Sequence, residues 1–236
     1  MIPLYHDFTD ETVLIFGGGP VGARKARRFA AEARVVVVSP EFGEDDFGGE
    51  EADVELIRAR PASEDVAAWI ERTAPALVVA ATDDEAVNEA VSAAAAERGL
   101  LINRADSSAI APDAIASDET ERETSARDVV VPATVADGDV RIAISTGGRS
   151  PALAKYLRER IEAEIEGAEE MAALTGKLRA ELRAADVEPS VRRVAIRAVV
   201  RDPLVWKTLR TGASNPRREA TRVIRNTIGG DRWTQE

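Results

Sequence analysis

Short runs of β-branched and aliphatic residues alternate with longer helix-forming stretches over the first hundred residues. This alternation is typical of a parallel sheet covered by helices. The apolar runs predict strands at residues 12–16, 34–38, 54–57, 77–81 and 100–103. The stretches between them predict helices at 21–33, 63–72 and 84–98. Ligands of such sheets bind at the carboxyl ends of the strands.

A glycine-rich turn, Gly17-Gly18-Gly19-Pro20-Val21-Gly22, follows the first strand and precedes the first helix. It satisfies the pattern GxGxxG, in which Gly17 permits the tight turn, Gly19 lets the backbone approach a pyrophosphate and Gly22 lets the helix pack on the strand. The helix also directs its first N–H groups at the anion. The pattern predicts an α/β, Rossmann-type domain with the strand order 3-2-1-4-5 over residues 1–112. The turn contributes the candidate cofactor-binding residues Gly17, Gly19, Pro20, Val21 and Gly22, and the alternative is a glycine-rich turn without a ligand.

The end of the second strand bears on the choice of cofactor, because an acid there binds ribose hydroxyls whereas an arginine signals a 2′-phosphate. The segment reads Ser39-Pro40-Glu41-Phe42, and no basic residue follows before Arg58. An acidic run formed by Glu41, Glu44, Asp45 and Asp46 would repel an extra phosphate. We therefore expect NAD rather than NADP, with Ser39, Pro40 and Glu41 near the ribose.

The later part of the chain predicts another strand, at 140–144, and three helices. The first helix begins at Pro151 and carries an apolar stripe that indicates a core or a dimer contact, formed by Leu153, Tyr156, Leu157, Ile161 and Ile165. Two further helices are predicted at 171–185 and 190–200. Before them, residues 113–127 are polar and without an apolar period, which predicts a solvated acidic insertion or, alternatively, a lid.

Charge is distributed unevenly along the 236 residues. The net charge is −11, and only 4 of the 31 basic residues are lysine, which predicts a salt-adapted, GC-rich host such as a halophilic archaeon, with codon bias as the alternative. Residues 1–150 hold 14 basic and 29 acidic residues, whereas residues 177–225 hold 13 basic and 5 acidic ones. A basic segment in an acidic chain predicts an anionic ligand.

The composition also argues against several kinds of site and partner. The chain has no Cys and one His, so we expect neither a disulfide framework nor a dedicated transition-metal site. Its longest apolar runs are far shorter than the roughly 20 residues that span a bilayer, and no signal segment is visible, which predicts a cytoplasmic protein without a membrane partner. The net charge and the 4% aromatic content argue against nucleic acid as a partner.

Four strings together resemble the siroheme synthase family, which comprises precorrin-2 dehydrogenases and sirohydrochlorin ferrochelatases. They lie at 17–27 (GGGPVGARKAR), 80–88 (AATDDEAVN), 103–106 (NRAD) and 144–151 (ISTGGRSP). The resemblance covers residues 1–165 well and continues more weakly to about 225, and it matches the stand-alone form of the family. It implies NAD-dependent oxidation of precorrin-2 to sirohydrochlorin, with ferrous iron insertion in some members. It also implies a homodimer, with a dimerisation region at 113–150 and a helical substrate-side domain at 151–236.

The resemblance places the essential acid or base at Asp106. The residues alone are consistent with this, because Asp106 follows the fifth strand and can remove a ring proton while hydride leaves; a capping or loop aspartate is the alternative. Asn103 is expected to orient the turn or the nicotinamide amide. Thr82 and Asp83 lie beside the expected cofactor and also qualify as a helix N-cap.

Backbone N–H groups, hydroxyls and a guanidinium converge in the segment after the sixth expected strand, which predicts a carboxylate cradle. The implied tetrapyrrole carries eight carboxylates, and the candidate substrate-binding residues are Ser145, Thr146, Gly147, Gly148, Arg149 and Ser150. A capped helix start with Arg149 in solvent is the alternative. Two other functions stay open: an NAD-sensing regulatory module without catalysis, and a dehydrogenase of another small substrate.

Overall fold

The computed structural model of the chain describes residues 3–49, 51–104, 128–212 and 215–229. The chain divides into two compact units. The first comprises residues 1–131 together with 147–149, and the second comprises residues 132–146 and 150–236. Residues 132–146, expected as part of a middle region, thus group with the helices that follow them.

The first unit is built on a parallel sheet of five strands in the order β3-β2-β1-β4-β5, which confirms the expected Rossmann-type topology. The strands are β1 (Thr12–Phe16), β2 (Arg34–Ser39), β3 (Val54–Arg58), β4 (Leu77–Ala80) and β5 (Leu101–Arg104). Phe16 at the end of β1 pairs with Val38 of β2 and with Ala80 of β4. The carboxyl ends of the central strands therefore meet at one edge, which prepares a binding site there.

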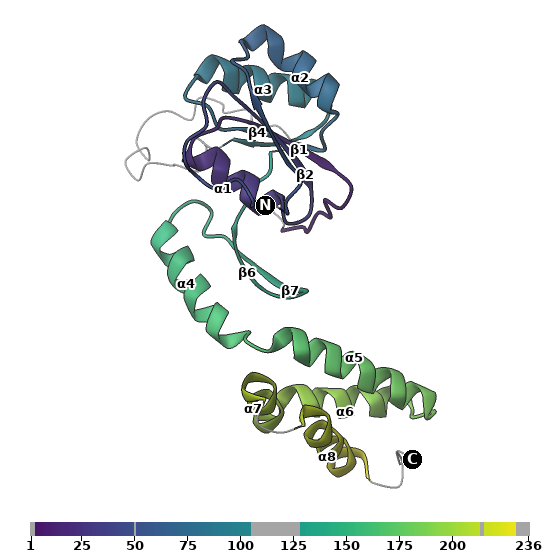
Figure 1. Cartoon of the computed structure of the whole chain (residues 1–236). Helices are drawn as coiled ribbons and strands as arrows, with labels where there is room; N and C mark the ends of the chain where they lie inside the picture. The colour runs from purple at the N-terminus through teal and green to yellow at the C-terminus, as the bar shows by residue number, and fades with distance from the viewer. Residues whose placement is uncertain (1–2, 50, 105–127, 213–214, 230–236) are drawn as a thin grey trace. The chain divides into compact units, whose positions relative to one another are not determined.

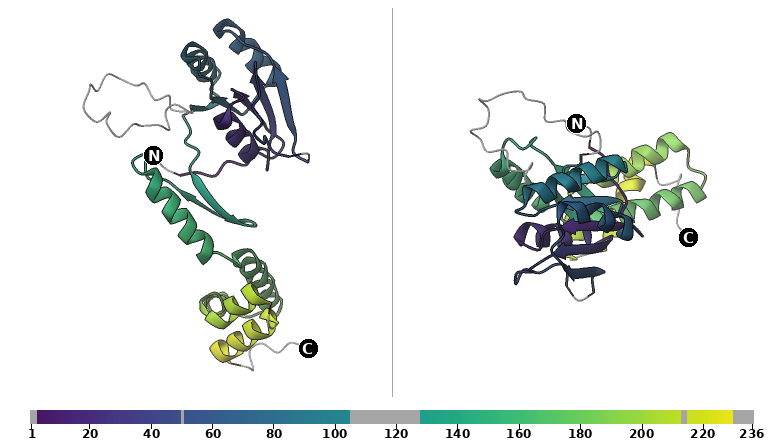
Figure 2. Two further views of the ribbon diagram at one scale, coloured as in Figure 1. Left: turned by 60° about the vertical axis from the view of Figure 1, so that its left-hand side comes forward. Right: turned by 90° about the horizontal axis from the view of Figure 1, so that it is seen from above.

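Helices cover both faces of this sheet (Figures 1 and 2). On one face α1 (Pro20–Phe29) packs against Val13, Ile15, Val35 and Val37. On the other, α2 (Val66–Thr73), which follows a short 3-10 helix at Ser63–Asp65, and α3 (Glu85–Glu97) pack against alternate residues of the same strands. The alternation along each strand supplies one apolar side chain to each face in turn.

Helix α1 is shorter at its C-terminal end than the sequence predicts, because it ends at Phe29 rather than near Ala33. The N–H of Ala33 still donates to the carbonyl oxygen of Phe29, at 2.8 Å. The next N–H, that of Arg34, already donates to Glu11, at 3.0 Å. The chain has to leave the helix here to enter β2.

The second unit begins with an antiparallel hairpin of β6 (Ala133–Asp137), which the sequence analysis missed, and β7 (Val140–Ile144). Its turn uses Gly138 with φ +54°, in the left-handed region. The carboxylate of Asp137 accepts hydrogen bonds from the N–H groups of Ala168 (2.7 Å) and Glu169 (3.3 Å). These two groups begin helix α5, whose N-cap, Gly167, has no capping side chain. The hairpin therefore caps a helix that lies about thirty residues further along the chain.

Five helices complete the second unit: α4 (Pro151–Glu164), α5 (Ala168–Ala184), α6 (Pro189–Arg201), α7 (Pro203–Thr211) and α8 (Pro216–Ile228). Helices α5 to α8 share a core that includes Leu178, Leu182, Val199 and Ile224. The sequence predicted α5 and α6 but not α7 and α8. Arg210 of α7 also contacts the end of α4, where Nε donates to the carbonyl oxygen of Glu166 and Nη2 to that of Glu164, both at 2.9 Å.

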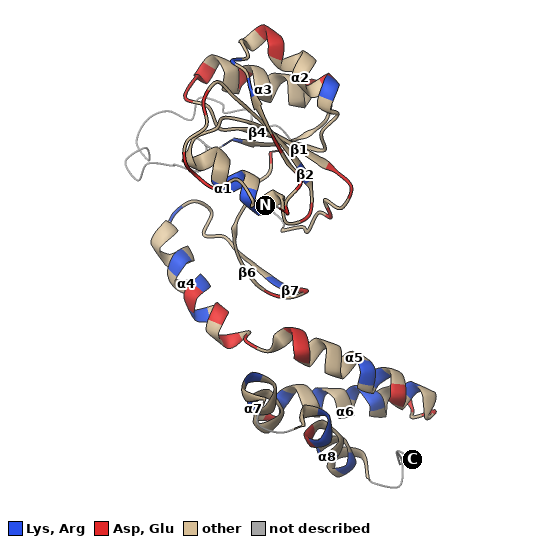
Figure 3. Ribbon diagram, in the orientation of Figure 1, with Lys and Arg blue, Asp and Glu red and all other residues tan. Residues whose placement is uncertain are grey.

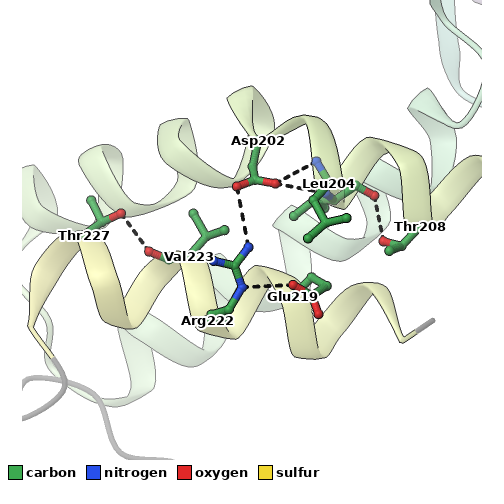
Figure 4. A network of polar contacts seen from close by, with 8 residues as sticks. Asp202, Leu204, Thr208, Glu219, Arg222, Val223 and Thr227 are labelled. Carbon is green, nitrogen blue, oxygen red and sulfur yellow. Dashed lines mark hydrogen bonds and ion pairs between the residues drawn. The ribbon is translucent and has the colours of Figure 1, made fainter.

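A capping residue followed by proline begins four of these helices, at Ser150-Pro151, Glu188-Pro189, Asp202-Pro203 and Asn215-Pro216. Proline suits the first helical position because its missing N–H has no partner to lose there. Figure 4 shows the Asp202 cap, whose carboxylate accepts from Leu204 (2.8 Å) and lies 4.0 Å from Arg222 Nη2. Arg222 in turn donates to Glu219 at 2.9 Å, so one aspartate both starts α7 and faces α8.

Lysine and arginine are prominent along α5, α6 and α8 (Figure 3). Among the residues with described positions, no helix is long and apolar enough to cross a membrane. Within those same ranges, no group of three or more His, Asp or Glu side chains is placed to hold a metal ion.

Candidate cofactor site

A pocket of about 620 Å³ lies at the carboxyl ends of β1, β2 and β4. Its walls are formed by residues 17–21, 38–43, 60–61 and 81–84, together with Val87. The pocket contains nine of the eleven residues predicted to bind the cofactor: Gly17, Gly19, Pro20, Val21, Ser39, Pro40, Glu41, Thr82 and Asp83. Gly22 and Asn103 lie outside its lining.

The three glycines of the GxGxxG pattern have different surroundings. Gly17 has φ +119°, and a Cβ atom there would overlap the carbonyl oxygen of Ala81. A Cβ at Gly22 would overlap the carbonyl oxygen of Gly17, so this glycine lets α1 pack against the loop. A Cβ at Gly19, in contrast, would meet no protein atom within 4 Å and would project into open space. The loop thus leaves room for a ligand at Gly19, next to the first turn of α1.

The tip of β2 forms one wall of the pocket. Ser39 is only 6% exposed, and its hydroxyl donates to the carbonyl oxygen of Glu41 at 2.7 Å. A Cβ atom at Gly18 would contact both Ser39 and Phe42, so the two loops fit closely. Because the Ser39 proton is used inside the turn, the Ser39 hydroxyl can only accept hydrogen bonds from a ligand. The Glu41 carboxylate is the charged group on this wall that suits ribose hydroxyls.

Only one member of the acidic run, Glu41, lines the pocket. Asp46 accepts hydrogen bonds from the N–H groups of Gly48 (2.9 Å) and Gly49 (3.0 Å). These bonds, first that from Gly48, hold the pKa of Asp46 below its ordinary value. Asp46 therefore shapes its own loop and does not determine what the pocket binds.

A basic residue that sequence reasoning missed, Arg60, lines the same pocket. The N–H of Ala59 donates to the carbonyl oxygen of Ser39 at 3.0 Å, which brings the chain after β3 alongside the tip of β2. The signal was present in the sequence, because Arg60 closely follows the third predicted strand. The predicted strand order already placed the third strand beside the second, but only the register that pairs Ser39 with Arg58 brings Arg60 level with Glu41.

The turn after β4 is held by a buried amide. Asn88 of α3 is 6% exposed; its Oδ1 accepts from the Thr82 hydroxyl (2.8 Å) and N–H (3.2 Å), and its Nδ2 donates to the Thr82 carbonyl oxygen (2.8 Å). The N-cap of α3 is neither Thr82 nor Asp83 but Asp84, whose carboxylate accepts from the N–H groups of Ala86 and Val87. Thr82 and the exposed Asp83 are thereby left as part of the pocket wall.

Asn103 on β5 is 2% exposed, and its Nδ2 donates to the carbonyl oxygen of Val129 at 2.8 Å. With the 2.8 Å bond from the Val129 N–H to Ile102, this amide ties residues 128–129 to the sheet. The Asn103 Oδ1 atom has no hydrogen-bond partner among the described residues. Asp106, the candidate catalytic residue, lies outside the described residues.

The predicted substrate segment forms a capped helix start. Ser150 is the N-cap of α4 and its Oγ accepts from the N–H of Leu153 at 3.3 Å. The Thr146 hydroxyl donates to the Ser150 carbonyl oxygen (3.2 Å) and accepts from its N–H (3.3 Å). Between them Gly147 and Gly148 have φ +62° and +77°. Ser145, Gly147, Gly148 and Arg149 are exposed, so capping and ligand binding are compatible in this segment.

One charged side chain of α1 is buried. Lys25 is 8% exposed, and burial, followed by repulsion from Arg28 and Arg24, lowers the pKa of its ammonium group to about 8. Lys25 does not line the pocket, and it is a source of instability rather than a ligand contact.

Together these residues fit a dinucleotide. The open space at Gly19 beside a helix N-terminus suits a pyrophosphate, the Glu41 carboxylate suits ribose hydroxyls, and an unpartnered buried amide oxygen stands at the end of β5.

Two segments of the chain match known protein families. Residues 4–113 match a family described as putative NAD(P)-binding, and residues 137–164 match the family of the sirohaem biosynthesis protein, central region. The precorrin-2 dehydrogenase of Methanosarcina barkeri is 30% identical over 87% of this chain and 85% of its own. The siroheme synthase of Stutzerimonas stutzeri is 31% identical over 97% of this chain, which spans only 44% of that protein.

A solved structure of SirC, a precorrin-2 dehydrogenase, has a TM-score of 0.63 and 23% identity, and the match covers 96% of this chain and 100% of that one. At this level of identity the likeness establishes a shared fold.

Proposed function

Because the chain belongs to the family of precorrin-2 dehydrogenases and siroheme synthases, we propose that it oxidises precorrin-2 to sirohydrochlorin with NAD as hydride acceptor. The observation that carries the proposal is the presence, in one chain, of a pocket shaped for a dinucleotide and of the central segment of sirohaem biosynthesis proteins. The pocket alone would suit many dehydrogenases, whereas the second segment points to a tetrapyrrole.

NAD, when bound, supplies the acceptor for the hydride that leaves the substrate. The chain's own residues would hold it: the first turn of α1 and the Gly19 backbone would bind the pyrophosphate, and Glu41 would accept hydrogen bonds from the ribose. Thr82, fixed by Asn88, closes the wall beside β4. Asn103 holds Val129 against the sheet through its side-chain amide.

The proton that accompanies the hydride needs an acceptor, and we assign it to Asp106, two residues beyond the end of β5. Loss of one hydride to NAD and one proton to a carboxylate accounts for the two-electron oxidation. This assignment rests on the family resemblance of the string at residues 103–106.

The segment 145–150 is proposed to bind substrate carboxylates. Ser150 still has its own hydroxyl proton to donate, because its oxygen only accepts from Leu153. Arg149 is exposed and makes no hydrogen bond or ion pair with another residue of the described ranges. Neutral and charged donors within one short turn suit a polycarboxylate.

Insertion of ferrous iron is a second candidate activity, favoured by the relatives named siroheme synthase. The described residues include no cluster of metal ligands. We therefore expect the nitrogen atoms of the tetrapyrrole to bind the iron, which enters as a substrate.

A homodimer is proposed from helix α4. The described chain buries none of its residues, and Leu153 and Tyr156 are 47% and 53% exposed. Apolar side chains repeated on one helical stripe are unusual on a free surface, which suggests that a second copy covers them. Replacing both with glutamate should convert a dimer into a monomer, as measured by light scattering after size-exclusion chromatography, whereas an unchanged molar mass would contradict the proposal.

Turnover tests the main proposal directly. Incubation of the protein with precorrin-2 and NAD should produce the absorbance of sirohydrochlorin, and ferrous iron added afterwards tests chelation. Asp106→Asn should reduce the dehydrogenation rate by about 10²- to 10⁴-fold and leave the Kd for NAD nearly unchanged. The matched control is Asp139→Asn, at an exposed hairpin position. NAD binding without any turnover would instead favour a regulatory module.

A further inference from the structure

Among the described residues that line the pocket, Arg60 is the one basic side chain, and its position is set by strand register. Ser39 at the end of β2 pairs with Arg58 at the end of β3. Glu41 lies two residues beyond Ser39, and Arg60 lies two residues beyond Arg58. Because adjacent strands run about 4.8 Å apart, Glu41 and Arg60 occupy equivalent places beyond neighbouring strands, and both line the pocket.

The guanidinium of Arg60 is available to a ligand. The residue is exposed and makes no hydrogen bond or ion pair with any other described residue. Two other arginines of the same unit are paired, Arg34 with Glu55 at 2.7 Å and Arg27 with Asp46 at 3.9 Å. The described lining otherwise carries only negative charge, on Glu41, Asp83 and Asp84.

We propose that Arg60 binds a phosphate group on the 2′-oxygen of the adenosine ribose, so that this pocket accepts NADP as well as NAD. Its planar guanidinium can donate two parallel hydrogen bonds to a phosphate. The neighbouring Glu41 repels that phosphate and accepts hydrogen bonds from the unmodified ribose. Two opposite charges at equivalent places thus give a preference for NAD that is small rather than absolute. The inference rests on the proposed function, which places the adenosine half of the cofactor at the tip of β2.

Binding measurements test this independently of turnover. Isothermal titration calorimetry of the full chain would compare NAD, NADP, 5′-AMP and 2′,5′-ADP, of which the last two lack the nicotinamide. We expect the parent protein to bind 2′,5′-ADP, and Arg60→Ala to raise the Kd for NADP and 2′,5′-ADP by about tenfold. The Kd for NAD and 5′-AMP should change by less than about twofold. Arg60→Lys should give an intermediate value, because it keeps the charge without the planar fork.

The matched control is Arg58→Ala, which removes an exposed arginine from the end of the same strand but outside the pocket. It should alter none of the four affinities. Equal weakening of NAD and NADP in Arg60→Ala would show a contact with the adenine or the pyrophosphate and would overturn the inference, as would a parent protein that binds 5′-AMP but not 2′,5′-ADP. A parent protein that binds none of the four would overturn the proposed function together with the inference.

Discussion

Asn88 holds Thr82 by both ends of its amide, with Oδ1 2.8 Å from the Thr82 hydroxyl and Nδ2 2.8 Å from its carbonyl oxygen. Thr82 lines the pocket, whereas Asn88 lies behind it, buried in α3. The shape of the pocket at β4 is therefore determined in part by a buried side chain that lies outside the pocket lining.

Asn88→Ala should lower both stability and cofactor affinity. The change removes three hydrogen bonds and leaves the polar groups of Thr82 partly unsatisfied, at a cost of about 2 kcal/mol in the free energy of unfolding. The Kd for NAD should rise several-fold because the turn is no longer fixed. Urea unfolding and calorimetry measure the two effects. Asn226→Ala on the exposed side of α8 is the control and should leave both unchanged, whereas an Asn88 variant with parental stability would contradict the role of the amide.

Gly19→Ala should separate cofactor binding from folding. A methyl group at Gly19 meets no protein atom within 4 Å, so thermal unfolding should occur close to the parental temperature. The same methyl group would occupy the space assigned to the pyrophosphate and should weaken NAD binding by more than about tenfold. Gly176→Ala, within α5 and also free of contacts, should raise stability by about 0.5 to 1 kcal/mol without affecting NAD. Unaltered NAD affinity in Gly19→Ala would place the pyrophosphate elsewhere.

Lys25→Met should stabilise the protein in a pH-dependent way. Burial lowers the pKa of Lys25 to about 8 from 10.5, so between these values the unfolded chain holds more protons and stability rises with pH. The penalty is fully present below pH 8, where the substitution should add at most about 3 kcal/mol, and it should fade by about pH 10. Urea unfolding at pH 7 and pH 10 measures it, with the exposed Lys177→Met as the control. An equal gain at both values of pH would show that charge burial is not the cause.

Charge reversal on α6 tests whether the basic helices serve the substrate. Arg193, Arg197 and Arg201 are exposed and spaced by four residues, so they share one side of the helix, whereas Arg192 donates to the Val187 carbonyl oxygen at 3.0 Å. Arg193→Glu with Arg197→Glu should raise the KM for precorrin-2 by a few-fold, since an exposed pair contributes about 0.2 to 1 kcal/mol. The Kd for NAD should stay constant. A fall in dimer content without a change in KM would instead indicate pairing with a protein surface.

Arg192→Glu belongs in a separate experiment, because loss of its bond to Val187 would confound binding with stability.

Local patterns made the first unit predictable. The glycine loop, strand β1 and helix α1 follow from short-range features: an apolar run, a turn that needs small residues and a helix directly after it. The strand order was predicted because these features together match a Rossmann-type sheet. Arg60 could not be found in this way, because its place in the pocket depends on the register between β2 and β3, which pairs Ser39 with Arg58. The link between Asn88 and Thr82 is equally invisible in the sequence, since it depends on the rotation of α3.

The second unit was harder to predict, although part of its signal is local. The capping residue and proline at Asp202-Pro203 and Asn215-Pro216 mark the starts of α7 and α8 as clearly as Ser150-Pro151 marks α4. Strand β6 is different, because its short sequence is recognisable as a strand only from its antiparallel pairing with β7 across the turn at Gly138. Asp137 could not be predicted as a helix cap either, because the helix that it caps begins about thirty residues later in the chain.

The Asp137 cap couples the stability of the hairpin to the stability of the first turn of α5. Without that carboxylate, the first N–H groups of α5 would turn to water, and the helix would fray from its start. A partner or ligand that holds the β6–β7 hairpin in place would therefore also order the first turn of α5. One that pulls the hairpin away would remove the cap and let this first turn unwind. By reciprocity, whatever stabilises α5 raises the affinity of the hairpin for its partner by the same factor. In this protein, the position of the hairpin and the order of the first turn of α5 are linked by the Asp137 carboxylate.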